Sequence, residues 1–179
     1  MDISITDFLT DWMALFLKNK DLIFKRFSSI TVDKNKLTLV QHNGTVQVFY
    51  VKPFPQDLVK ELQDIKAHST TSFGIVVANT KRNFEALIHH WDALVNMHKQ
   101  LCIYFVNPFS GRAKQWAIHP ATHQLITGGS GLKLGLTALF DTVEETTEDE
   151  LTKNIKEHAL SEAYPLHIST ASAKKEDDS

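Results

Sequence analysis

The sequence predicts an α/β fold in which helices flank a central mixed sheet, built from a three-strand meander and a strand–helix–strand unit. Three observations lead to this class. Several segments repeat apolar residues at helical spacing, turn signals separate short strand-like runs, and two continuous apolar runs suit strands buried on both faces. With 179 residues, the chain is long enough for one domain with a real core.

The first part of the chain predicts one helix, a meander and a second helix. Apolar residues at spacings of three and four mark one face of a helix that extends from residue 5 to about 27. Strand-like runs follow at 29–33, 37–40 and 46–52. Polar turns separate them, and one contains Asn43-Gly44, a strong hairpin signal. Pro53 ends the last strand because proline cannot donate to a ladder, and Pro55 is predicted to open the next helix.

The second part of the chain predicts the strand–helix–strand unit. Its two strands are the apolar runs 73–78 and 101–106, and Thr80 caps the helix between them. Such a connection is expected to be right-handed, with parallel strands. The remaining predicted elements are an outer strand at 115–118, a turn at 119–123, and a helix that follows the Gly128–Gly131 turn.

The predicted domain organisation is one α/β domain over residues 1–145, a C-terminal surface helix over 146–166 and a disordered polar tail over 167–179. The net charge of −2 lacks the basic footprint that dedicated DNA-binding domains usually show. Because Cys102 is the single cysteine, no internal disulfide can form, and a reducing cytoplasmic location is expected. No apolar segment is long enough for a membrane span, so no membrane partner is expected.

The order helix, three-strand meander, helix, strand, helix, strand resembles the core of the PD-(D/E)XK, or restriction-endonuclease-like, superfamily, over roughly residues 5–107. In that family the second strand carries an aspartate, and the third ends in Glu-x-Lys or Asp-x-Lys. The resemblance implies carboxylates that hold a divalent cation, and a lysine that positions the nucleophile and neutralises developing charge. Lys52 stands at the lysine position. Tyr50 replaces the acid, and the second strand, 37–41, contains no acid.

The departure at Tyr50 predicts a degenerate site, because a neutral phenol is a poor ligand for a hard cation such as Mg²⁺. The leading hypothesis is a non-catalytic nuclease-fold module without a cofactor, which binds nucleic acid or a protein of a nucleic-acid-processing assembly. The alternative is a divergent Mg²⁺-dependent nuclease that uses Asp33, a displaced carboxylate such as Glu61, and Lys52. A third alternative is a purely structural homodimer that pairs through the edge of the outer strand.

A basic and aromatic cluster is the candidate nucleic-acid-binding surface. It consists of Arg112, Lys114, Trp116 and His119, on and beside the predicted outer strand. Cations and aromatic rings together suit single-stranded nucleic acid. A core position or an oligomer contact explains the tryptophan equally well.

Two further patterns have structural explanations. His119 and His123 have the spacing of a metal-binding helix face, but Pro120 and the expected turn argue against a helix there. No cysteine or acid nearby completes a zinc shell, so no metal site is predicted. Cys102 lies within an apolar run and is therefore predicted to be a small buried hydrophobe rather than a nucleophile.

Overall fold

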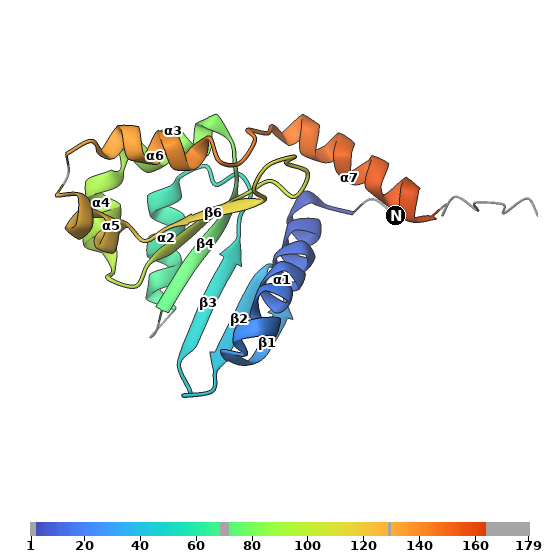
Figure 1. The fold of residues 1–179 in the computed structure, drawn as a ribbon, viewed down its shortest axis with the longest axis horizontal. Coiled ribbons are helices and arrows are strands. Elements are labelled where there is room, and N and C mark those ends of the chain that lie inside the picture. The colour runs from blue at the N-terminus through green and yellow to red at the C-terminus, as the bar shows by residue number, and fades with distance from the viewer. Residues whose placement is uncertain (1–2, 69–71, 129, 164–179) are drawn as a thin grey trace, which may run out of the picture.

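The computed structural model of the chain describes residues 3–68, 72–128 and 130–163. A six-stranded mixed sheet in the order β1-β2-β3-β4-β5-β6 is flanked by helices on both faces (Figure 1). The strands are β1 (Phe27–Asp33), β2 (Lys36–Gln41), β3 (Val46–Val51), β4 (Ser72–Ala78), β5 (Cys102–Val106) and β6 (Gln115–Ile118). The helices are α1 (Ile5–Phe24), α2 (Leu58–Ala67), α3 (Lys81–His89), α4 (Trp91–Met97), α5 (Pro120–Thr127), α6 (Leu132–Phe140) and α7 (Glu148–Ala163). The predicted α/β class and the mixed sheet are confirmed.

The strand directions follow the order that the turn signals predict. β1, β2 and β3 form an antiparallel meander, and Gly44 turns the chain between β2 and β3 with a φ of 84°, which glycine adopts at no steric cost. β3, β4 and β5 then run parallel to one another, and β6 returns antiparallel to β5. Every residue of β4 is buried, because this central strand has covered faces on both sides.

Two apolar layers lie on opposite faces of the sheet. α1 covers one face (Figure 1), where its buried stripe of Leu9, Met13 and Leu17 packs on side chains of β2 to β5. Helices α2, α3, α4 and α6 contribute to the larger core on the other face, which includes Phe73, Ile75, Phe105 and Trp116 of the strands. The carboxyl ends of β3, β4 and β5 therefore meet at one edge of the sheet, between these two layers.

The first helix ends three residues before the expected limit. Ser4 caps its start by accepting the Asp7 N–H at 3.1 Å. At the other end Lys25 turns into the left-handed region, with a φ of 45°, and the buried Asp21 carboxylate accepts the N–H groups of Arg26 and Phe27 at 2.8 and 3.0 Å. These two bonds stop the helix and direct the chain into β1, so the apolar pattern overestimates its length.

Other helix boundaries also differ from the expectation. Pro55 precedes α2 rather than opening it, because Asp57 is the capping residue and accepts the Lys60 N–H at 3.0 Å. Thr80 caps α3 as predicted, by accepting the Asn83 N–H, but the helix breaks at His90 and continues as α4.

The turn predicted at 119–123 is wrong, because these residues begin α5. Pro120 occupies the first helical position, where its missing N–H has no intrahelical partner to lose. The His123 N–H donates to the His119 carbonyl at 2.8 Å, which closes the first turn. Pro120, from which we predicted the absence of a helix, therefore begins one.

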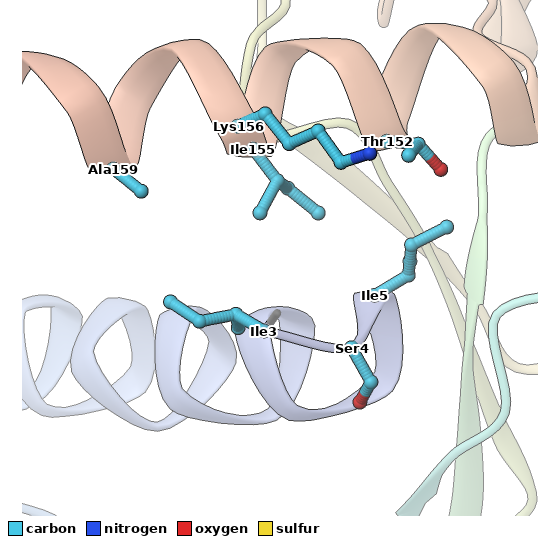
Figure 2. Close-up of a pocket in the computed structure, with 7 residues that line it drawn as sticks. All are labelled: Ile3, Ser4, Ile5, Thr152, Ile155, Lys156 and Ala159. Carbon is cyan, nitrogen blue, oxygen red and sulfur yellow. The ribbon is translucent and has the colours of Figure 1, made fainter. Parts of the chain in front are cut away.

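α7 packs against the beginning of α1. Leu151 and Ile155 are the buried residues of its inner face, and a hollow of about 280 Å³ lies between the two helices. Figure 2 shows Ile3 and Ile5 on one side of this hollow and Ile155 and Ala159 on the other. The helix lies within the predicted span 146–166, of which residues 164–166, like the predicted tail 167–179, lie outside the described residues. No helix in the described part of the chain is long and apolar enough to cross a membrane.

Candidate functional site

The candidate site begins where β3 ends, at the carboxyl edge of the parallel strands. The Lys52 N–H donates to the Val76 carbonyl at 2.9 Å and extends the pairing of β3 with β4 by one residue. The next carbonyl, of Pro53, accepts the Ala78 N–H at 3.0 Å and the Asn83 side-chain amide at 2.8 Å. This backbone is therefore fixed against both β4 and α3, so the position of Lys52 is well defined.

Lys52 forms an ion pair with Glu61. Its Nζ lies 3.3 Å from Glu61 Oε2, and the two side chains are 40% and 32% exposed. Glu61 stands in the first turn of α2, which covers the face of the sheet toward which Lys52 points. The structure thus brings two of the three candidate catalytic residues together, and it places the carboxylate against the ammonium group.

Tyr50 and Asp33 lie in one row across the sheet. Asp33 is opposite Lys36, and Lys36 is opposite Tyr50, so the three side chains share a face. Two strand spacings separate Asp33 from Tyr50, which puts their Cα atoms about 10 Å apart. Tyr50 is half-buried and packs against the core on the α2 side, while Asp33 is exposed on the outermost strand. The structure therefore does not gather Asp33 with Lys52 and Glu61 into one cluster.

Metal-ligating side chains are dispersed over the described residues. Within them, no group of three or more His, Cys, Asp or Glu side chains is placed to hold a metal ion. His119 and His123 lie one turn apart on α5, as the metal-site spacing requires, but His123 packs edge-on against Trp91, with ring centroids 5.8 Å apart. Burial raises the pKa of the Cys102 thiol to about 12, and the predicted role of a buried hydrophobe is confirmed.

Trp116 of the candidate nucleic-acid cluster belongs to the core. It is 4% exposed, stacks on Phe105 with centroids 4.3 Å apart, and donates its indole N–H to Asn79 Oδ1 at 2.8 Å. Because one ring face is covered and the side chain is buried, it offers no exposed surface to a nucleobase in this structure. β6 is a short edge strand, but its inward side chains complete the core.

The three polar members of that cluster have separate surroundings. Arg112 donates from Nη1 to the Asp141 carbonyl at 3.1 Å, and Lys114 donates to the Ser110 carbonyl. His119 is exposed at the start of α5 and lines a hollow of about 390 Å³, whose lining does not include Arg112 or Lys114. Arg112 and Lys114 therefore help to hold the loops beside β6, and the four residues do not form one continuous exposed surface.

Sequence reasoning missed a buried amide network at the carboxyl ends of β4 and β5. Asn79 is fully buried and donates to the Val143 carbonyl at 2.9 Å, while Asn107 donates to the Glu144 carbonyl at 3.0 Å. The Glu144 N–H in turn donates to Ser110 Oγ at 3.1 Å. These bonds tie the segment between α6 and α7 to the sheet. The signal was present, because an asparagine directly follows each of the two apolar runs.

The carboxyl edge therefore presents a lysine–glutamate ion pair and a phenol beside amides that are already hydrogen-bonded. The ion pair links α2 to the end of β3, and the amides bind the connecting loops. No protein-family model, no curated protein and no solved structure matches this chain.

Proposed function

We propose that this chain is a degenerate restriction-endonuclease-like module that binds a partner and does not cleave nucleic acid. Two features of the fold support the family assignment: a helix precedes an antiparallel meander, and the third strand of that meander runs parallel to the next two. The observation that carries the functional proposal is the ion pair between Lys52 and Glu61 at 3.3 Å, with Tyr50 two residues before the lysine.

The balance of charge around Lys52 is the physical reason for proposing that the chain does not cleave nucleic acid. A divalent cation in a nuclease site needs several oxygen ligands with negative charge, and a cleaving lysine needs its ammonium directed at the substrate. Here one carboxylate and one ammonium compensate each other, and the neutral Tyr50 side chain supplies no ligand charge. The pair links α2 to the end of β3.

The partner is nucleic acid or a protein of a nucleic-acid-processing assembly. Ligands of open α/β sheets bind outside the carboxyl ends of the strands. Beyond the end of β4, a hollow of about 260 Å³ is lined by Phe54, Thr80, Lys81, Arg82 and residues 145–148. Lys81 and Arg82 provide positive charge for phosphates, and the neighbouring glutamates provide complementary charge for a basic protein surface.

A divergent metal-dependent nuclease is the second candidate, and one observation favours it. Glu61 reaches Lys52 from α2, which is what a carboxylate displaced from the third strand onto the following helix would do. In that case Glu61 would bind Mg²⁺ and Lys52 would face the substrate, but Asp33, the remaining acid of this alternative, lies outside their cluster on β1.

A cleavage assay separates the two candidates. The full chain is incubated with single- and double-stranded DNA and RNA in Mg²⁺ or Mn²⁺, beside Lys52→Ala and the control Lys153→Ala, which removes a lysine paired with Glu157 on the exposed side of α7. The proposal predicts no cleavage by any of the three proteins. Metal-dependent cleavage that Lys52→Ala abolishes and Lys153→Ala retains would overturn it in favour of the nuclease.

Binding is measured on the same nucleic acids by fluorescence anisotropy at several salt concentrations. A nucleic-acid partner predicts an affinity that falls steeply with salt, because bound cations release counterions. Absence of binding even at low salt would contradict a nucleic-acid partner and favour the purely structural homodimer.

A further inference from the structure

The end of α1 carries the most conspicuous apolar surface that the function above leaves unexplained. Leu22, Ile23 and Phe24 are consecutive and are 70%, 84% and 66% exposed. Three consecutive helical residues project over about 200° of the helix circumference, so one neighbouring surface within the fold cannot cover all three. Figure 1 shows this end of α1 beside β1, at the edge of the sheet and away from the carboxyl ends of the parallel strands.

Positive charge surrounds these three residues. Lys18, Lys20, Lys25 and Arg26 are all exposed, although the chain as a whole has a net charge of −2. The one acid in this stretch, Asp21, is buried and engaged by two backbone N–H groups and by Arg26, whose Nε lies 3.8 Å from its carboxylate. These contacts offset the negative charge of Asp21, and the exposed charged side chains around it are all cationic.

A hollow of about 420 Å³ lies directly beside the apolar residues. Its lining combines Lys18, Lys25 and His42 with the hydroxyls of Ser28 and Ser29. Leu22 also lines it, and so does Asp21, whose carboxylate accepts the N–H groups of Arg26 and Phe27. Ammonium groups and hydroxyls are the side chains that bind phosphate oxygens. Apolar side chains for an acyl region and cations for phosphates thus lie next to each other.

We propose that the end of α1 is a membrane-surface anchor that binds anionic phospholipid bilayers. Leu22, Ile23 and Phe24 enter the boundary between headgroups and acyl chains, and the four cations and the adjacent hollow contact the lipid phosphates. Nucleic acid would satisfy the cations but leaves the aliphatic Leu22 and Ile23 without an apolar environment. The expectation of no membrane partner rested on the lack of a spanning segment, and surface attachment needs none.

The test measures binding of the full chain to vesicles of phosphatidylcholine alone and to vesicles that also contain phosphatidylserine. The proposal predicts binding to the anionic vesicles only, with loss at high salt. Lys18→Gln/Lys25→Gln lowers this binding roughly tenfold or more. The control Lys133→Gln/Lys153→Gln, which removes two exposed lysines on α6 and α7, leaves it within about twofold.

The chain contains a matched control for the apolar part. Leu125 and Ile126 on α5 form the same dipeptide and are 85% and 79% exposed. Leu22→Ser/Ile23→Ser is predicted to lower anionic-vesicle binding roughly tenfold or more, and Leu125→Ser/Ile126→Ser to leave it unchanged. Equal loss in both double variants would overturn the proposal.

Insertion is read directly with a polarity-sensitive dye on Ile23→Cys, because the native Cys102 is buried and its raised pKa makes it unreactive in the folded chain. The emission is predicted to shift to the blue on anionic vesicles, and the same dye on Leu125→Cys is predicted not to shift. Three results would contradict the proposal: no binding to anionic vesicles, oligonucleotide binding through Lys18 and Lys25 without vesicle binding, or self-association that Leu22→Ser/Ile23→Ser removes.

Discussion

Gly74 in β4 has no room for a side chain. A Cβ at this position would collide with the Cys102 carbonyl oxygen and would lie 2.6 Å from Cε1 of Phe49. Both neighbours are buried, so neither can move aside without disturbing the sheet. Only glycine satisfies this position in β4.

Gly74→Ala is therefore predicted to lower the free energy of unfolding by about 1–3 kcal/mol. Gly135→Ala is the matched control: its Cβ meets nothing within 4 Å in α6, and alanine should raise stability by about 0.5–1 kcal/mol. Urea unfolding followed by circular dichroism measures both. A Gly74→Ala protein as stable as the native chain would show that the strands are not packed in this way.

Asn79 is the residue on which the buried amide network depends. Asn79→Ala leaves the Trp116 N–H and the Val143 carbonyl without their side-chain partner, at a predicted cost of about 2–4 kcal/mol in unfolding free energy. Asn96→Ala removes an exposed amide that bonds only to its own helix, and should cost less than about 1 kcal/mol. Similar losses for the two variants would argue against the network.

At the residue scale, the sequence predicted which residues stand at the end of β3 better than it predicted which side chains contact one another. Only the nuclease alternative placed Glu61 near Lys52, and the structure pairs the two side chains because α2 follows β3 after a short connection. The burial of Trp116 could not be predicted, since a four-residue strand has no periodicity strong enough to show which side chains face inward. Its partner Asn79 lies 37 residues earlier, a separation that no local pattern reveals.

At the element scale, the junction between α1 and β1 depends on the ionised form of Asp21. Desolvation opposes ionisation, but the N–H groups of Phe27 and Arg26, together with the Arg26 charge, outweigh it and hold the pKa of Asp21 below its usual 3.8. The folded-state pKa is thus lower than the unfolded one. The stabilisation is complete above the unfolded value and is lost as the pH falls through the folded value.

Asp21→Asn is accordingly predicted to be less stable than the native chain at neutral pH, and this difference should shrink as the solution is made acidic through the range below 3.8. Asp11→Asn, which removes an exposed carboxylate from the same helix, controls for net charge. Unfolding free energies of the three proteins across the acid range measure the effect. A difference that grows in acid would have the wrong sign for a capping carboxylate.

The packing of α7 gives the second prediction at this scale. Leu151, near the start of α7, is fully buried, whereas Leu160, near the end of the same helix, is 63% exposed. Leu151→Ala is predicted to lower the unfolding free energy by about 2–4 kcal/mol, and Leu160→Ala by less than about 1 kcal/mol. Thermal and urea unfolding compare the two. Equal effects would mean that α7 does not pack as described.

Strands were easier to predict than helix boundaries. Turn residues and continuous apolar runs predict the meander and the two buried strands, because each of these signals is contained within a few residues of the sequence. The break between α3 and α4 at His90 interrupts an apolar pattern that continues unchanged across it, so periodicity alone predicts one helix. α5 was missed because proline disrupts the interior of a helix but is favoured at its first position, which Pro120 occupies.

At the scale of the whole molecule, the sheet has two outer strands that are protected differently. Ala113 pairs with Val143 beside the start of β6, which covers part of that edge. β1 lies at the other edge, and most of its residues are exposed. The structural homodimer through the outer strand stays a prediction, and β1 offers a longer free edge for pairing than β6 does.

At the carboxyl edge, we propose that Glu61 neutralises Lys52 and does not bind a metal. Titration of the full chain with Mn²⁺, with free Mn²⁺ followed by electron paramagnetic resonance, tests it most directly, with Glu61→Gln as the paired variant. We predict no stoichiometric Mn²⁺ site that depends on Glu61, and an identical titration for the variant. One Mn²⁺ bound per native chain and lost in Glu61→Gln would contradict it and identify a working metal site.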